Sequence, residues 1–160
     1  MADAAGRVAA AVGLPVSPLT SARDVDDALV VETVPARELA SAAAQRAAKA
    51  VAEVADLAGA GRVALVAAAH RFTELQESLA ALGRAVSADP ADGSAVDVGS
   101  DLVLLTPVQS KGLEFDVVVL LEPAEVLDDG PGDLYVAMTR PTQALHVVHA
   151  RPLPAGLLPS

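Results

Sequence analysis

Along the chain, short runs of β-branched apolar residues alternate with longer segments in which apolar residues recur at helical spacing. The apolar and β-branched runs predict strands at residues 28–34, 62–68, 102–105, 116–121 and 144–149. Helices are predicted at residues 3–12, 36–58, 71–82 and 133–139. Strands that alternate with helices favour an α/β fold with a mostly parallel sheet.

Proline and glycine mark where these elements begin and end. Pro35 occupies the place of a first helical residue, and Gly59 and Gly83 follow the last residues of two helices. The helix predicted at 71–82 has Phe72, Leu75, Leu79 and Leu82 on one expected core face. Residues 89–100 are expected to form a loop or a weak hairpin.

The domain boundaries follow from the same pattern. A chain of 160 residues is expected to form one domain, which we place at residues 28–151. Residues 1–27 are interpreted as a lead-in helix and linker, and residues 152–160 as a C-terminal tail. The alanine-rich start suggests a fragment of a longer protein.

The amino-acid composition limits the kinds of site that the chain can form. Only 2% of the residues are aromatic, so the core must be aliphatic, and the absence of cysteine excludes disulfides and thiolate metal sites. The three histidines are too few to suggest a zinc site. His146 and His149 are three apart on a predicted strand, which places them on opposite faces and argues against a shared metal.

The net charge of −10, with only two lysines, makes the chain by itself a poor clamp for duplex DNA. No apolar stretch is long enough to span a bilayer, and the N-terminus does not resemble a signal peptide. We therefore expect a soluble, cytoplasmic protein with no membrane partner. The chain also lacks a Gly-x-x-x-x-Gly-Lys-Ser/Thr phosphate loop, which argues against a self-contained nucleotide hydrolase.

One polar segment, Thr106–Asp116, joins two apolar strands. It carries the hydroxyl of Ser110, the cation of Lys111 and the carboxylate of Glu114 within five residues, and Gly112 permits a sharp turn. Ligands of open α/β sheets bind at the carboxyl ends of strands, so we expect this segment to lie at such a site. A solvated loop with an incidental Lys–Glu pair is the alternative.

A second segment, Asp133–Gln143, is predicted to be a short helix ended by Pro141. Thr139 and Arg140 would then lie at its tip. The planar guanidinium of an arginine fixed there suits the spread charge of a transferring phosphoryl group. A solvent-facing arginine that merely follows a core helix is the alternative.

Together the two segments resemble the last two motifs of the UvrD/Rep-like superfamily-1 helicases. Lys-Gly-Leu-Glu-Phe at 111–115 and Tyr-Val-Ala-Met-Thr-Arg at 135–140 are similar to Thr-x-His-x-x-Lys-Gly-Leu-Glu-aromatic and Tyr-Val-Ala-x-Thr-Arg-Ala. The resemblance covers about the last 55 residues closely. It implies the second RecA-like domain, called 2A, of a two-domain motor, with a three-layer α/β sandwich that lacks its own phosphate loop.

The resemblance also implies roles for individual residues. Arg140 would be the arginine finger on the γ-phosphate of ATP, and Glu114 would contact the ribose. Gly112 and Lys111 would shape and line the nucleotide site. The remaining residues would couple the cleft to the nucleic-acid track: Thr106, Gln109, Ser110 and Thr139. Magnesium would be held mainly by an N-terminal RecA-like domain of the same protein. That domain is the first partner that the resemblance implies.

Departures from the family pattern decide between its branches. Val108 stands at the family's histidine position, and Pro131 and Gly132 replace the usual basic pair. No large inserted domain interrupts residues 28–151. With the acidic charge, these features are more similar to the HelD branch, the RNA-polymerase-associated ATPases, and residues 145–154 resemble its actinobacterial members. A UvrD/Rep-type DNA helicase, with DNA as partner, and a non-catalytic α/β interaction domain remain the alternatives.

Overall fold

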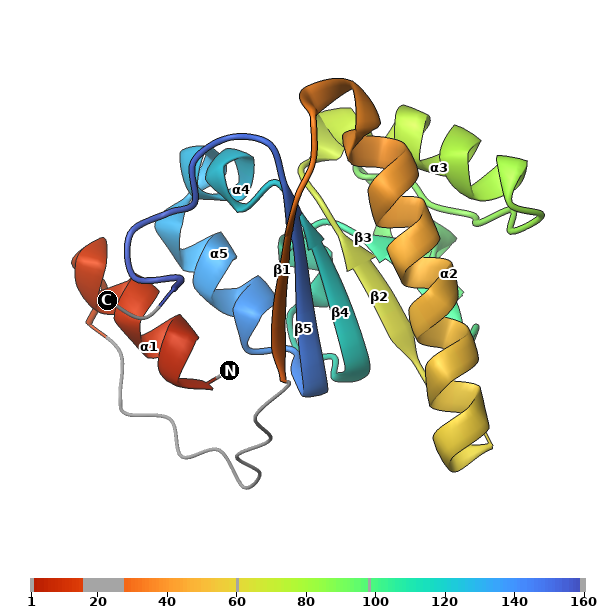
Figure 1. The fold of residues 1–160 in the computed structure, drawn as a ribbon, viewed down its shortest axis with the longest axis horizontal. Helices are drawn as coiled ribbons and strands as arrows, with labels where there is room; N and C mark the ends of the chain where they lie inside the picture. Colours follow the sequence, from red (N-terminus) through yellow and green to blue (C-terminus); the bar gives the residue numbers. More distant parts are fainter. Residues whose placement is uncertain (1, 16–27, 60, 98, 159–160) are drawn as a thin grey trace.

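A computed structural model describes residues 2–15, 28–59, 61–97 and 99–158, and Figure 1 shows how their elements are arranged. The five strands are β1 (Leu29–Thr33), β2 (Val63–Val66), β3 (Leu102–Leu105), β4 (Phe115–Leu121) and β5 (Pro141–His149). The five α-helices are α1 (Ala2–Ala11), α2 (Leu39–Ala58), α3 (Phe72–Ala81), α4 (Pro123–Asp129) and α5 (Pro131–Met138). Single 3₁₀ turns lie at Ala36–Glu38, Ala69–Arg71, Gly93–Ala95 and Val108–Ser110.

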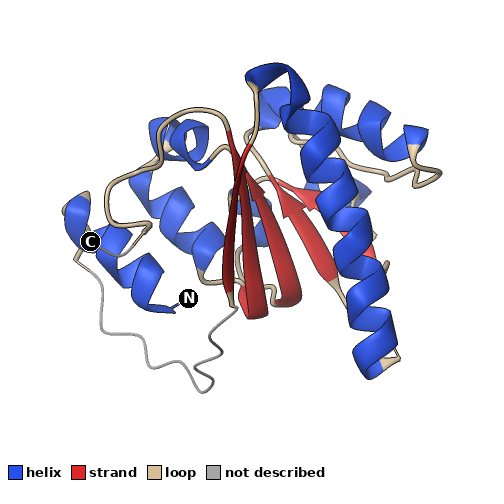
Figure 2. Ribbon diagram, in the orientation of Figure 1, coloured by secondary structure: helices blue, strands red, loops and turns tan. Residues whose placement is uncertain are grey.

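The strands form one sheet in the order β1-β5-β4-β2-β3, and every neighbouring pair is parallel. Helices cover both faces of this sheet, as parallel sheets require (Figure 2). The α/β class is therefore confirmed, and the architecture is a three-layer sandwich of the RecA-like kind. The sheet is wholly parallel, a stricter result than the mostly parallel sheet predicted.

Two aliphatic cores lie on the two faces of the sheet. Along β4, Val117, Val119 and Leu121 point to the core under α2 and α3. The alternate residues Val118 and Leu120 point to the core under α1, α4 and α5. Alternation between two buried faces explains why the sequence of this strand is a continuous apolar run.

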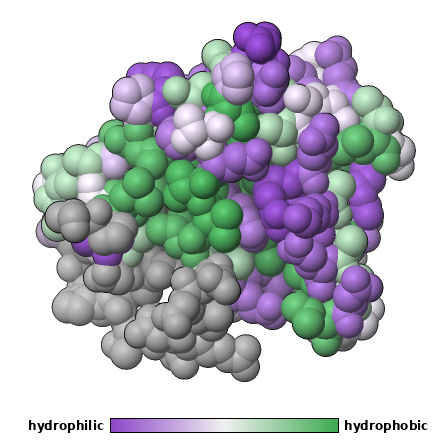
Figure 3. Space-filling model, viewed as in Figure 1, coloured by the Kyte–Doolittle hydropathy of each residue, from purple (hydrophilic) through white to green (hydrophobic). Residues whose placement is uncertain are grey.

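The surface of the α2 side is hydrophilic. Figure 3 shows polar residues gathered there, with an apolar area beside them. Arg46 and Lys49 of α2 both form ion pairs with Glu53 of the same helix, at 2.8 and 3.9 Å. Within the described residues, no helix has the length and hydropathy needed to cross a membrane.

Helix α1 and residues near the C-terminus pack together against α5. Ala4, Ala5 and Val8 of α1 are buried in the same core as Leu157. Arg7 Nε donates a hydrogen bond of 3.1 Å to the Gly156 carbonyl. The linker predicted within residues 1–27 lies largely outside the described residues, so its division from the domain stays a prediction.

Three predictions about element boundaries were wrong. Pro35 does not begin the helix, because residues 36–38 form a 3₁₀ turn and α2 begins only at Leu39. Leu82 lies beyond α3 and is 45% exposed. The helix predicted to begin at residue 133 begins at Pro131, and α4 precedes it where no helix was predicted.

Local chemistry explains the helix that was missed. Two prolines, at positions 123 and 131, occupy the first turns of α4 and α5, where a missing N–H costs nothing. Gly130 separates the two helices with an extended backbone, at φ 174°. Strand β5 likewise begins at Pro141 rather than at residue 144, since proline is tolerated as the first residue of a strand.

Candidate functional site

Glu114 and Arg140 are neighbours at one edge of the sheet. Glu114 directly precedes β4 and Arg140 directly precedes β5, and the first residues of these strands, Phe115 and Pro141, are paired in register. The Phe115 N–H donates a hydrogen bond of 3.1 Å to the Arg140 carbonyl. The backbones of the two predicted motifs therefore meet, at the spacing of about 4.8 Å that separates paired strands.

This edge is the amino end of β4 and β5, so the expected location at a carboxyl end was wrong for Glu114. Arg140 lies just beyond the end of α5, as predicted. Thr106 does lie at the carboxyl end of β3. The second of two parallel strands begins at the edge opposite to the one where the first strand ends, so the chain must run back along the sheet. Glu114 therefore lies at the opposite edge from Thr106. We call the edge formed by Lys111–Glu114 and Arg140 the amino-end rim.

The Arg140 guanidinium is half-buried and bonded to neutral acceptors. Nε donates to the Val136 carbonyl at 3.2 Å, and Nη1 donates to the Leu113 carbonyl at 3.4 Å. Nη2 donates to the Thr139 hydroxyl oxygen at 3.2 Å. These bonds use three of its five N–H groups, and no acid within the described residues pairs with it. Two N–H groups of a fixed guanidinium are left for a ligand.

Thr139 orients this arginine. Its hydroxyl lies 3.1 Å from the Tyr135 carbonyl and 3.0 Å from the Val136 carbonyl, and it donates to these acceptors while its oxygen accepts from Arg140. The carbonyls at the end of α5 carry the negative end of the helix dipole, which stabilises a cation placed there. In the described structure Thr139 is thus a positioning residue for the guanidinium.

The residues between Thr106 and Ser110 bond to one another and to the protein. The Thr106 N–H donates to Gln109 Oε1 at 3.0 Å, and the Gln109 N–H donates back to Thr106 Oγ1 at 3.2 Å. Gln109 Nε2 donates to the Asp89 carbonyl at 2.7 Å. Ser110 is fully buried, and its hydroxyl donates to the Pro107 carbonyl at 2.6 Å. These side chains hold the turn that leads to the rim.

Lys111, Gly112 and Glu114 are exposed beyond that turn. Gly112 has φ +77°, a left-handed conformation that favours glycine, and open space surrounds its α-carbon. Neither Lys111 nor Glu114 forms a hydrogen bond or ion pair with another side chain in the described parts of the chain. The rim therefore offers one free ammonium, one free carboxylate and a guanidinium.

Sequence analysis missed Arg62, which precedes β2 at the same edge. Its guanidinium carbon lies 5.0 Å from the centre of the Phe115 ring, a cation–π contact. The backbone N–H of Arg62 donates to Asp116 Oδ2 at 2.7 Å, and Gln143 Nε2 donates to Asp116 Oδ1 at 3.0 Å. Asp116 thereby ties the starts of three strands together, a role that no local sequence signal indicates.

The opposite, carboxyl edge holds an ionic cluster of its own. Arg71 bonds to Glu125 through two nitrogens and to Glu74 at 2.7 Å. Burial raises the pKa of Glu125, but the hydrogen bonds and charge of Arg71 outweigh it, so this pKa lies below its ordinary value. The same contact raises the pKa of Arg71. Because these charges neutralise one another, little net charge is left to bind an external ligand.

The two C-terminal histidines lie on opposite faces of β5, as predicted. His149 Nδ1 donates to the Arg151 carbonyl at 2.8 Å, because a carbonyl can only accept, and Nε2 then accepts from the Thr33 hydroxyl at 2.9 Å. His146 faces α2, where burial and the nearby charge of Arg46 lower its pKa to about 4. In the described residues no three metal-ligating side chains gather.

The fold has known counterparts, although no protein-family model and no curated protein matches the chain. Eleven chains of solved structures match it. One is the C-terminal domain of a possible DNA helicase from Lactobacillus plantarum WCFS1, with a TM-score of 0.63 and 18% sequence identity. The match covers 97% of this chain and 86% of the other. At this level of identity the similarity shows a shared fold.

Proposed function

We propose that the chain is the C-terminal RecA-like domain of a superfamily-1 helicase-like ATPase. In this proposal ATP binds between the amino-end rim and a second RecA-like domain that carries the phosphate loop. Arg140 places positive charge on the γ-phosphate, and Glu114 accepts hydrogen bonds from the ribose. The shared fold with a helicase C-terminal domain supports the class of protein.

One observation carries the assignment of residues. The Phe115 N–H donates to the Arg140 carbonyl, so the two motifs that resemble the helicase family converge on one edge. The guanidinium is held by carbonyls and a hydroxyl rather than by a carboxylate, so its charge is not neutralised within the described structure. A preorganised cation of this kind stabilises charge that develops during phosphoryl transfer.

The rim suits a nucleotide but not a resident metal. Lys111, Gly112 and Arg140 offer cations and an open backbone turn to phosphate groups. Glu114 is the one carboxylate at 111–114, too few ligands to hold magnesium alone. In the proposal the ion is therefore bound by ATP and by the other domain, and it neutralises phosphate charge there.

The ribose contact can be tested with a pair of substrates. In a protein that contains both RecA-like domains, Glu114→Ala should raise the KM for ATP about tenfold, because a hydrogen bond to a charged acceptor is lost. The KM for 2′,3′-dideoxy-ATP, which lacks the ribose hydroxyls, should not change. Asp129→Ala, an exposed acid at the end of α4, is the matched control. An equal effect of Glu114→Ala on both substrates would contradict the contact.

Within this class we favour the HelD branch, with RNA polymerase as the partner, over a UvrD/Rep-type DNA helicase. The net charge of −10 and the exposed Val108 in place of the family's histidine support that choice, since both weaken contact with phosphates. The test compares RNA polymerase capture with unwinding of a tailed duplex by the same protein. Unwinding without polymerase binding would favour the DNA helicase.

A further inference from the structure

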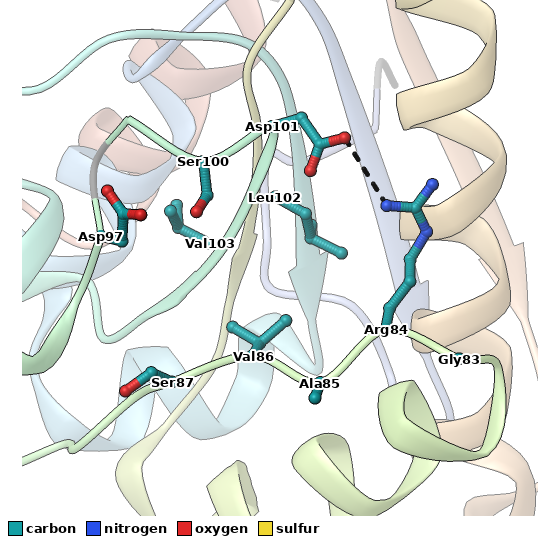
Figure 4. Close-up of a pocket in the computed structure, with 10 residues that line it drawn as sticks. All are labelled: Gly83, Arg84, Ala85, Val86, Ser87, Asp97, Ser100, Asp101, Leu102 and Val103. Carbon is teal, nitrogen blue, oxygen red and sulfur yellow. Dashed lines mark ion pairs between the residues drawn. The ribbon is translucent and has the colours of Figure 1, made fainter.

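Most arginines that the structure describes pair with acids, but Arg62 does not. At the start of β3, for example, Arg84 pairs with Asp101 at 3.7 Å, as Figure 4 shows. The Arg62 guanidinium bonds to no acceptor within the described ranges, and its Nε is buried without a partner. The contact that it does make is with the ring of Phe115, whose centre lies 5.0 Å from the guanidinium carbon. A buried donor without an acceptor costs free energy, so this placement of Arg62 calls for a reason.

The side chain of Arg62 lies on the same face of the sheet as α5. The next residue, Val63, points to the core under α2, and successive strand residues point to opposite faces. Phe115, which Arg62 contacts, belongs to the core under α5. The strands β2 and β5 flank β4 in the sheet. Arg62 and Arg140 therefore lie on one face of the sheet, on either side of the start of β4.

The pairing of β4 with β5 is irregular at the point where this ring lies. Phe115 pairs with Pro141 and Val117 pairs with Ala144, so β5 has one residue more than β4 between these pairs. An extra residue of this kind disrupts the ladder of backbone hydrogen bonds locally. A side chain compensates in part, because Thr142 Oγ1 donates to the Phe115 carbonyl at 3.3 Å. The position of Phe115 thus depends on side-chain contacts more than it would in a regular strand.

Phe115 connects the two motifs of the amino-end rim. Glu114 directly precedes it, and its own N–H donates to the Arg140 carbonyl at 3.1 Å. Arg140 Nη1 in turn donates to the carbonyl of Leu113, two residues before the ring, at 3.4 Å. A displacement of Phe115 would therefore move the Glu114 carboxylate and one of the acceptors that fix the Arg140 guanidinium.

We propose that Arg62 is a positioning residue for the amino-end rim, an inference that rests on the function proposed above. Its cation holds the Phe115 ring, and through Phe115 it keeps the Leu113 carbonyl in place for Arg140. A cation–π contact gains strength when the cation loses water, which explains why the Nε of Arg62 is buried against the ring. In this role Arg62 does not touch ATP.

Single-turnover ATP hydrolysis by a protein with both RecA-like domains is the first test. Arg62→Met keeps a long unbranched side chain but removes the charge, and it should slow hydrolysis about tenfold because the contact with the ring is weakened. Arg62→Lys, which can place an ammonium over the ring, should recover most of the rate. Arg37→Met, at an arginine whose side chain is 82% exposed, should hydrolyse ATP at the wild-type rate.

A double variant separates positioning from direct contact with the nucleotide. In an Arg140→Ala background, Arg62→Met should cause no further loss, because Arg62 acts through Arg140. The same tenfold loss in both backgrounds would overturn the proposal. A wild-type rate in Arg62→Met, measured beside a slow Arg140→Ala, would overturn it too and would leave the proposed ATPase function standing.

Hydrogen exchange of the 160-residue chain tests the contact without ATP, so it remains decisive if the ATPase proposal fails. In Arg62→Met the amide of Phe115 should exchange about tenfold faster, and in Arg62→Lys it should exchange nearly as in wild type. The amide of Leu120, in the middle of β4, should be unchanged in both variants. Unchanged exchange at Phe115, or an equal increase at Phe115 and Leu120, would overturn the positioning role.

Discussion

Single residues in this protein are held by contacts that sequence patterns do not reveal. Gly112 was singled out as a turn residue, and its φ of +77° agrees. Arg140 is predicted from the sequence to be fixed at a helix tip, and three of its N–H groups bond to the end of α5 and to Leu113. The residue types were predictable from the motifs, but the acceptors that fix the guanidinium depend on where the two segments meet.

The backbone at Gly112 makes a prediction about stability. Gly112→Ala should lower the free energy of unfolding by about 1 kcal/mol, because a side chain is disfavoured at positive φ. Gly132→Ala has equally open surroundings without positive φ, and it should change stability by no more than about 0.5 kcal/mol. Urea unfolding of both variants measures the difference. Equal effects would contradict the strain argument.

His146 predicts a pH dependence. Its pKa is about 4 in the folded chain and 6.5 in the unfolded chain, so the unfolded state binds more protons between these values. The free energy of unfolding should therefore fall as the pH is lowered through this window, by on the order of 1 kcal/mol from this residue. Unfolding of wild type and His146→Gln from pH 7 to 4 isolates the contribution. Parallel curves would contradict it.

At the scale of elements, continuous apolar runs predicted β2, β3, β4 and the buried part of β5, because strands buried on both faces need continuous hydrophobicity. The edge strand β1 is only partly buried, and its β-branched residues predicted it instead. Helix α4 was missed because its seven residues are too few to show a helical period, and because its sequence reads as a turn. The 3₁₀ turn before α2 was also missed, because no sequence signal marks it. At Glu38 the backbone φ is −103°, which departs from α-helical values.

The packing of α1 against the C-terminal residues gives an element-scale prediction. A β-carbon at Gly156, where φ is +87°, would lie 2.5 Å from the Arg7 carbonyl oxygen. Gly156→Ala should therefore displace α1 and cost about 2 kcal/mol. Hydrogen exchange should then rise in α1 and not in α2. Unchanged protection of α1 would contradict this packing.

At the scale of the whole molecule, the sheet order determines which residues can act together. The sequence indicated both motifs, but their meeting at the amino ends of β4 and β5 follows from a parallel sheet whose order is not sequential. This meeting cannot be derived from local patterns, because it depends on which strands become neighbours.

The rim is one wall of the proposed cleft, and this predicts the behaviour of the isolated chain. Residues 1–160 should neither hydrolyse ATP nor bind it tightly, since the sequence lacks a phosphate loop. Calorimetric titration with ATP and magnesium, together with a phosphate-release assay, checks both statements. Sustained turnover by this chain alone would contradict the shared cleft.

The central claim is that Arg140 acts on the γ-phosphate, and single-turnover ATP hydrolysis tests it most directly. In a protein with both RecA-like domains, Arg140→Ala should slow hydrolysis on the order of a thousandfold while ATP still binds. Arg140→Lys should also be slow, because an ammonium cannot reproduce the planar guanidinium. Arg151→Ala, at the opposite edge of the sheet, should hydrolyse ATP at the wild-type rate. Wild-type hydrolysis by both Arg140 variants would contradict the account.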